Sequence, residues 1–171
     1  MTREDAFFQM LLIRSGITEE YDAWFDRYLE EEDPLSDIVL ALVDAGSDFN
    51  KILSCLYFYT AERPIDYAKV TEMLRLYLKN AYESGRFDKI TCTSYMYRFA
   101  EKSGRMHEEF APMMTISDYL SYADDGLCDK EKWEKILFLP YLSEGKIGDH
   151  HTLWNAPRLS FRQRVKRFFG I

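Results

Sequence analysis

The chain has 171 residues, 47% hydrophobic and 30% charged, which is enough to bury the core of one soluble domain. Its 22 Lys and Arg against 29 Asp and Glu give a net charge of −7, an acidity that disfavours nucleic acid as a partner. No apolar run approaches the ~20 residues of a membrane-spanning helix, and the N-terminus lacks the pattern of a secretory leader, so we expect neither membrane insertion nor secretion.

Capping residues and helix breakers divide the first part of the chain into four predicted helices. A Ser, Thr or Asp side chain caps the first turn by accepting a hydrogen bond from a free backbone N–H, and Gly or Pro ends the helix. The predicted starts and ends are Thr2 to Arg14, Thr18 to Asp33, Ser36 to Gly46, and Ser47 or Asp48 to the residue before Pro64.

The clearest helical pattern covers residues 67–84, between a cap at Asp66 and Gly85. Its apolar residues recur at i, i+3 and i+4, as on one face of a helix. Three further helices are predicted from Asp88 to Gly104, Ser117 to Asp125, and Asp129 to Ser143, with Pro140 expected to end or kink the last. No segment alternates with the period of a strand. The sequence therefore predicts an all-α, single-domain array or bundle of about eight helices, with repeat-like helical hairpins as one form of packing.

The charge is distributed unevenly along the chain. Residues 158–171 contain five bases and no acid, which leaves 17 bases against 29 acids, a net charge of −12, in the preceding part. We therefore divide the single domain into an acidic helical body over 1–144, a linker loop over 145–157 and a basic C-terminal tail over 158–171.

The apolar residues of this tail have helical spacing. Phe161, Val165, Phe168 and Phe169 form a stripe bordered by Arg and Lys, which predicts an amphipathic helix. Three placements remain open. The tail docks on the acidic body, which we favour; it lies on an anionic membrane surface; or it contacts nucleic acid, which the charge of the body opposes.

Catalytic and cofactor-binding motifs are absent from the sequence. There is no Gly-rich phosphate loop, no Cys-x-x-Cys pair, no two-His zinc helix and no esterase serine elbow. We therefore predict no enzymatic activity, no cofactor and no metal. The three cysteines, Cys55, Cys92 and Cys128, are an odd number and widely spaced, which indicates free thiols and a cytoplasmic protein.

One short segment offers a competing hypothesis. In Asp149-His150-His151, two adjacent imidazoles and a carboxylate are potential metal ligands, with Asp149 or Cys128 completing a site. A metal-dependent enzyme that uses His150 and His151 is one alternative, and we favour it least. The simpler interpretation is a polar loop with solvated histidines, because neighbouring residues rarely converge on one metal.

The second predicted helix concentrates acidic residues beside aromatic ones. A run of acids on a helix is typical of a solvated face. The alternative is a docking surface for a basic partner, because clustered like charge raises association rates and rejects acidic competitors. On that interpretation exposed rings anchor the contact. The predicted partner-binding residues are Glu19, Asp22, Trp24, Asp26, Tyr28, Glu30 and Asp33.

In its size, acidity and helical pattern, including the stretch from Leu35 to Asp48, the chain resembles the immunity proteins of bacterial contact-dependent growth inhibition and polymorphic toxin systems. The resemblance implies a cytoplasmic protein that binds one cognate toxin, commonly a basic nuclease domain, and blocks its active or substrate-binding surface. A helical adaptor or regulatory protein is the alternative that the sequence leaves open.

Overall fold

The computed structural model describes residues 1–61, 64–104 and 108–153, and in these ranges the chain is helical without strands. Helices α1 to α7 and the continuous stretch α8–η2–α9 form the all-α array of eight helices that the sequence predicts. The bounds are α1 Arg3–Arg14, α2 Tyr21–Glu31, α3 Asp37–Ala45, α4 Phe49–Ala61, α5 Tyr67–Glu83, α6 Lys89–Lys102, η1 Glu108–Phe110, α7 Ala111–Asp124, α8 Lys130–Trp133, η2 Glu134–Phe138, α9 Leu139–Glu144 and η3 His150–Leu153.

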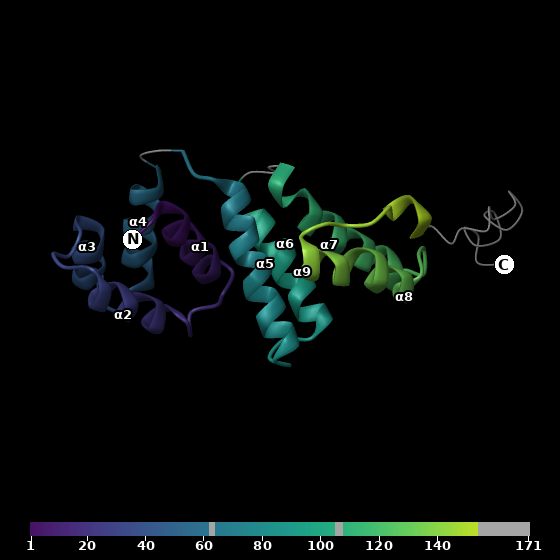
Figure 1. The fold of residues 1–171 in the computed structure, drawn as a ribbon, viewed down its shortest axis with the longest axis horizontal. Coiled ribbons are helices and arrows are strands. Elements are labelled where there is room, and N and C mark those ends of the chain that lie inside the picture. Colours follow the sequence, from purple (N-terminus) through teal and green to yellow (C-terminus); the bar gives the residue numbers. More distant parts are fainter. Residues whose placement is uncertain (62–63, 105–107, 154–171) are drawn as a thin grey trace, which may run out of the picture.

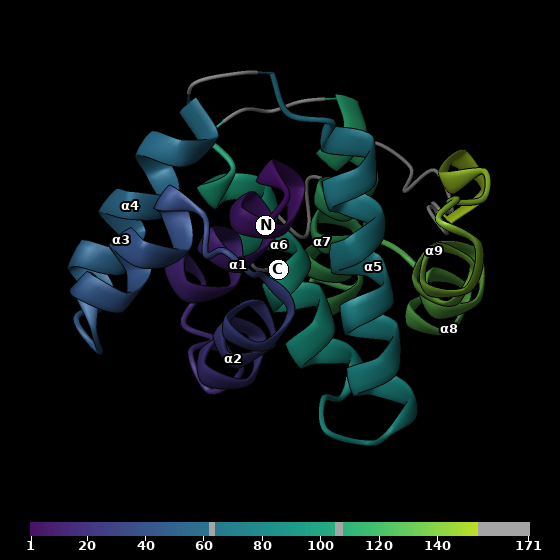
Figure 2. The same cartoon turned by 60° about the vertical axis from the view of Figure 1, so that its left-hand side comes forward.

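The helices form three groups along the long axis of the molecule (Figure 1). Helices α1 to α4 form one end, α5 and α6 the middle, and α7 to α9 the other end. Contacts of α1 with α5 and α6 join the first end to the middle, and contacts of α6 with α7 and of α5 with α9 join the middle to the second end. A second view shows α1 enclosed between α4 and α5 (Figure 2).

Side-chain caps place several helix starts where the sequence predicts them. The Thr2 hydroxyl accepts a hydrogen bond from the backbone N–H of Asp5 at 3.1 Å. The Asp66 and Asp88 carboxylates do the same for α5 and α6, at 3.1 Å and 2.7 Å. Each cap satisfies an N–H that the first turn cannot pair internally, so these boundaries follow from local chemistry.

Two predicted helix starts are wrong. Helix α2 begins at Tyr21 rather than after Thr18, because the Glu19 carboxylate accepts a hydrogen bond from the Thr18 N–H at 3.0 Å and a turn precedes the helix. Helix α7 begins at Ala111 instead of near Ser117. Pro112 lies in its first turn, where a missing N–H costs no internal hydrogen bond.

Pro140 neither ends nor sharply breaks its helix. The chain widens into the π-helical turn η2 just before Pro140, and α9 continues from it to Glu144. Proline cannot donate to the preceding turn, and the Ile136 carbonyl instead accepts a hydrogen bond from the Gly148 N–H at 2.8 Å. This hydrogen bond attaches the segment after α9 to the helical stretch that contains Pro140.

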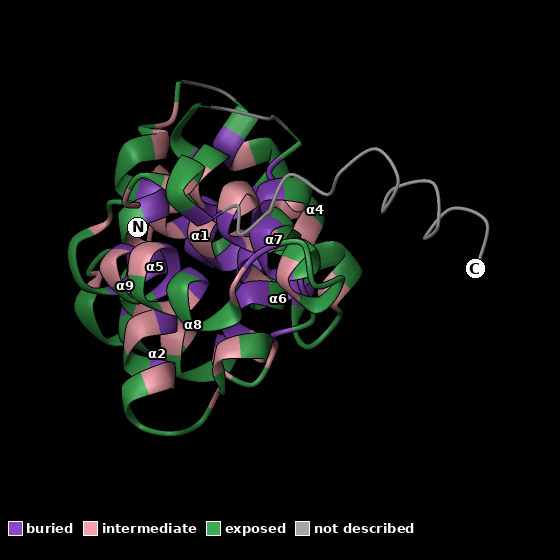
Figure 3. Ribbon diagram, turned by 90° about the vertical axis from the view of Figure 1, so that its right-hand side faces the viewer, coloured by how far each residue is buried: buried purple, intermediate pink, exposed green. Residues whose placement is uncertain are grey.

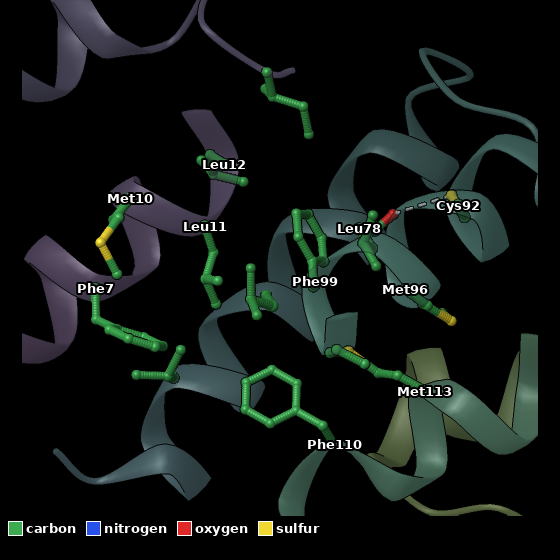
Figure 4. Packing of buried hydrophobic residues seen from close by; sticks show 14 of the residues in the cluster. Phe7, Met10, Leu11, Leu12, Leu78, Cys92, Met96, Phe99, Phe110 and Met113 are labelled. Carbon is green, nitrogen blue, oxygen red and sulfur yellow. Dashed lines mark hydrogen bonds between the residues drawn. The ribbon is translucent and has the colours of Figure 1, made fainter. Parts of the chain in front are cut away.

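The core runs through the whole array, with buried positions on the inner side of each helix (Figure 3). Aliphatic, sulfur-containing and aromatic side chains of α1, α5, α6, η1 and α7 meet in its centre (Figure 4). Cys92 belongs to this centre, with its thiol 3.9 Å from the Leu78 carbonyl oxygen. Burial raises the pKa of the Cys92 thiol to about 12, so the thiol is protonated and behaves as a small core residue.

The predicted linker is described only as far as residue 153. In that part, η3 packs on the body and Leu153 is fully buried. Residues 154–157 of the linker and the predicted tail helix over 158–171 lie outside the described residues. Of the helices in the described ranges, none has the length and apolar character that a bilayer-spanning segment requires.

Candidate functional site

Helix α2 attaches to the body through its aromatic side. The buried Tyr21 ring stacks on Phe25 at 5.7 Å between centroids and meets the edge of Phe49 from α4 at the same distance. Burial raises the pKa of Tyr21 to about 12, in keeping with a phenol inside the core. Because this side faces inward, the acidic side of α2 faces solvent.

Four of the predicted carboxylates lie on that solvent-facing side. Asp22, Asp26 and Glu30 are exposed and four residues apart, so they form a row along α2, and the exposed Asp33 follows the end of the helix. Within residues 1–61, 64–104 and 108–153, none of these four forms an ion pair. Their charge is therefore not neutralised by the described part of the body.

Glu19 differs from the other predicted acids because it is paired within the molecule. Arg86, in the turn after α5, contacts the Glu19 carboxylate at 2.9 Å and also pairs with Glu20. A hydrogen bond from its own backbone N–H, together with the one from Arg86, holds the pKa of Glu19 below its ordinary value. The hydrogen bond to Glu20 raises the pKa of Arg86. This cluster ties the start of α2 to the middle of the molecule.

The two predicted aromatic anchors have different environments. Tyr28 is buried, 6% exposed, so the prediction of an exposed ring is wrong for this residue. It lies seven residues after Tyr21, on the inward side of α2. The Arg27 guanidinium covers its ring at 4.8 Å, and burial raises the pKa of Tyr28 to about 12. Trp24 is half-buried and its ring meets that of Tyr28 at 5.3 Å. Trp24 is thus the one predicted ring that solvent reaches.

Trp24 also borders a groove between α1 and α2. The groove has a volume of about 350 Å³, and Glu19, Ala23 and Arg27 line it on the side of α2. An apolar edge therefore lies next to the row of unpaired carboxylates.

Exposed apolar residues on α3 and α4 were not predicted. Phe58 is 69% exposed, and its ring meets the exposed ring of Tyr57 edge-on at 5.8 Å. Leu40 is also exposed, and an open groove of about 470 Å³ runs between Ala41 and Phe58. Helices α3 and α4 lie at the same end of the molecule as α2 (Figure 1). The four-residue spacing of Ser54 and Phe58 on the outer side of α4 is the signal that predicts this exposure.

The histidine segment forms a turn on α7. The Asp149 carboxylate accepts a hydrogen bond from the backbone N–H of His151 at 3.0 Å, and the ring of His150 meets that of Tyr119 at 5.4 Å. Cys128 is buried with its sulfur 3.3 Å from the Tyr119 carbonyl oxygen. Among the described residues there is no group of three or more His, Cys, Asp and Glu side chains that could hold a metal ion.

Comparison with known proteins gives no relative of this chain: no protein-family model matches it, and no curated protein and no solved structure is similar to it.

Proposed function

We propose that this chain is a cytoplasmic immunity protein that binds a cognate bacterial toxin and covers the toxin's active or substrate-binding surface. The partner is a basic protein domain of the nuclease class. To neutralise the toxin by covering this surface, the chain itself needs no catalytic group, no cofactor and no bound nucleic acid.

The row of unpaired carboxylates on α2 is the observation that carries the proposal. Asp22, Asp26 and Glu30 present three negative charges in one line, in a part of the chain whose net charge is already −12. A nuclease concentrates positive charge where it binds phosphate. The same positive charge attracts an acidic helix, and a helix bound there excludes the nucleic acid.

Exposed apolar side chains at the same end supply the short-range part of the contact. Buried aromatic residues dominate the energy of protein interfaces, while charges at the rim mainly raise the association rate. Phe58, 69% exposed, its exposed neighbour Tyr57 and the half-buried Trp24 are rings available for this role. The surface thus combines electrostatic attraction on α2 with apolar anchors on α2 and α4.

The test uses the protein encoded immediately upstream of this chain as the candidate toxin. A bacterial host expresses that protein alone, with the wild-type chain, or with the variant Asp22→Lys, Asp26→Lys, Glu30→Lys. We expect growth arrest by the upstream protein, rescue by the wild-type chain, and loss of rescue with the variant. Titration calorimetry of the purified pair measures the same loss as a lower affinity.

The matched control reverses three exposed acids at the opposite end of the molecule, Asp125→Lys, Glu131→Lys and Glu144→Lys, so that the net charge changes equally. This control retains rescue if α2 is the binding surface. Loss of rescue in the control but not in the α2 variant would place the interface elsewhere. An upstream protein that neither arrests growth nor binds the wild-type chain would contradict the proposed function itself.

A further inference from the structure

A third groove lies between α6 and α7. It has a volume of about 600 Å³ and a mainly apolar wall. Phe110, Ala111 and Met114 line it on the side of η1 and α7, and Ala100 and Tyr97, which is 42% exposed, line it on the side of α6. An open apolar groove of this kind loses free energy by remaining in contact with water.

The groove has the length and spacing that fit a helix. Its α6 wall uses residues 97, 100, 101 and 104, and its α7 wall uses residues 111, 114, 115 and 118. Each wall thus covers two helical turns, which is about 10 Å at 1.5 Å per residue. A helix that binds such a groove inserts side chains spaced i, i+4 and i+7.

Carboxylates border the groove on both sides. Glu101 on α6, Glu108 in η1 and Asp118 on α7 all line it. Glu101 pairs with its neighbour Lys102 at 3.2 Å. Glu108 and Asp118 have no ion-pair partner among the described residues. An occupant with Arg or Lys beside its apolar stripe would therefore be matched in charge.

The chain's own C-terminal sequence has this combination. Phe161, Val165 and Phe168 have the i, i+4, i+7 spacing, and five bases with no acid lie within residues 158–171. Their stripe spans eight positions, the same number as each wall of the groove. The C-terminal segment therefore matches the groove both in the spacing of its apolar residues and in its charge.

The described chain ends close enough for this segment to reach the groove. Leu153 is packed in η3, where the His150 ring contacts Tyr119, the neighbour of the groove residue Asp118 on α7. Seven residues lie between Leu153 and Phe161, so eight residue steps separate the two. They span up to about 26 Å when extended, more than twice the ~10 Å diameter of a helix, so the chain can pass around α7.

We propose that residues 158–171 bind in the groove between α6 and α7 of the same molecule, with Phe161, Val165 and Phe168 on its apolar floor and the bases beside Glu101, Glu108 and Asp118. The C-terminal segment then completes the core at this end of the molecule and neutralises part of the acidic body. Asp22, Asp26 and Glu30 of α2 would remain without an ion pair.

Disulfide cross-linking in the full-length chain tests this placement. The variant Met114→Cys, Val165→Cys is made with Cys55→Ser, because Cys55 is half-buried whereas Cys92 and Cys128 are buried. Under mild oxidation of the dilute protein we expect an internal disulfide, seen as a reducible shift in gel mobility and by peptide mass. The control pairs Val165→Cys with Val43→Cys, an exposed position on α3 at the far end, and we expect no such bond there.

Hydrogen exchange gives an independent measurement. In the full-length variant Phe161→Ser, Phe168→Ser, we expect amides of residues 97–104 and 111–118 to exchange roughly tenfold faster than in the wild type. Gln163→Ser, on the opposite side of the stripe, leaves them unchanged. Equal exchange in all three proteins, equal cross-linking of the Met114→Cys and Val43→Cys variants, or a Met114→Cys product that is a linked dimer would each overturn binding within one molecule.

Discussion

Among the glycines that the structure describes, Gly148 has the least room for a side chain. A Cβ atom at this position would lie 2.8 Å from the Ile136 Cγ2 atom and 2.9 Å from the Ile136 carbonyl oxygen. In a regular helix the N–H of residue 140 would donate to this oxygen, but Pro140 has no N–H. The oxygen accepts a hydrogen bond from the Gly148 N–H instead. Gly148 and Pro140 therefore form one structural unit, although they are eight residues apart.

The first prediction concerns this contact. Gly148→Ala should lower the free energy of unfolding by about 1–3 kcal/mol, because the added methyl group must displace backbone as well as side-chain atoms. Urea unfolding followed by circular dichroism measures the change. Ser143→Ala, at an exposed position of α9, is the control and should differ little from the wild type. Equal midpoints for Gly148→Ala and the control would refute the close approach.

At the scale of elements, Arg75 joins α5 to α9. Its side chain is buried, its Nε donates a hydrogen bond to the Glu72 carboxylate at 2.7 Å, and a second nitrogen donates to the Leu142 carbonyl oxygen. A buried guanidinium needs such partners, since removing one leaves an uncompensated charge. The hydrogen bond from Arg75 lowers the pKa of Glu72, and the one to Glu72 raises the pKa of Arg75.

The second prediction follows from the lowered pKa of Glu72. A carboxylate whose pKa is lower in the folded than in the unfolded chain stabilises the fold at pH values above its unfolded pKa, which is 4.5 for Glu72. This stabilisation is lost as the pH falls through the pKa of the folded state. Glu72→Gln should therefore be less stable than the wild type at neutral pH. The difference should narrow below about pH 4.5, where the wild-type carboxylate also becomes neutral.

Urea unfolding of both proteins at neutral and acidic pH measures this narrowing. Glu83→Gln is the matched control. Glu83 is exposed, and its ion pair with Lys79 on the same helix is long, at 3.9 Å. This variant should show little difference at any pH. A stability difference for Glu72→Gln that is independent of pH would contradict the role of the ion pair.

Local chemistry explains which elements could be predicted from the sequence. The caps at Thr2, Asp66 and Asp88 act within three residues, so their helices begin where expected. The π-helical turn before Pro140 depends on a partner that arrives from beyond α9, which no local pattern contains. The start of α2 was misplaced because the Glu19 side chain bonds back to the Thr18 N–H.

The candidate site was predictable to the extent that helical periodicity determines it. The four-residue spacing of Asp22, Asp26 and Glu30 places them on one exposed side, as expected. The pairing of Glu19 with Arg86 joins residues 67 positions apart, so only the tertiary structure reveals it. Tyr28 shares the inward side with Tyr21, and the aromatic spacing that indicated an anchor indicates a core residue instead.

At the scale of the whole molecule, the two ends differ in what they leave uncompensated. The end formed by α1 to α4 combines unpaired acids on α2 with exposed rings on α4. Toward the other end, α6 and α7 border an acid-lined groove that the basic C-terminal sequence matches. On both proposals, the first end is therefore the surface left for a partner.

The association rate with the upstream-encoded protein should depend on the acids of α2. Unlike charges steer diffusional encounter, and salt screens them with a Debye length of about 8 Å at physiological ionic strength. The wild-type association rate should fall as salt is raised. The variant with Asp22, Asp26 and Glu30 changed to Lys should associate more slowly at low salt, with little change in the dissociation rate. Stopped-flow or surface-based kinetics over a salt series separates the two rates, and identical salt slopes for both proteins would exclude α2 from the encounter.

Phe58 should act on the other rate. The Phe58 ring is 69% exposed in the free protein, and a partner that buries it gains a short-range apolar contact. Such a contact slows dissociation of the complex and has little effect on the association rate. Phe58→Ala should therefore raise the dissociation rate roughly tenfold or more, with an unchanged association rate and an unchanged salt slope. Leu76→Ala, at an exposed apolar position on α5, is the control and should leave both rates as they are. If Phe58→Ala behaved like this control, the interface with the partner would be confined to the charged side of α2. The groove between α3 and α4 would then lie outside the interface.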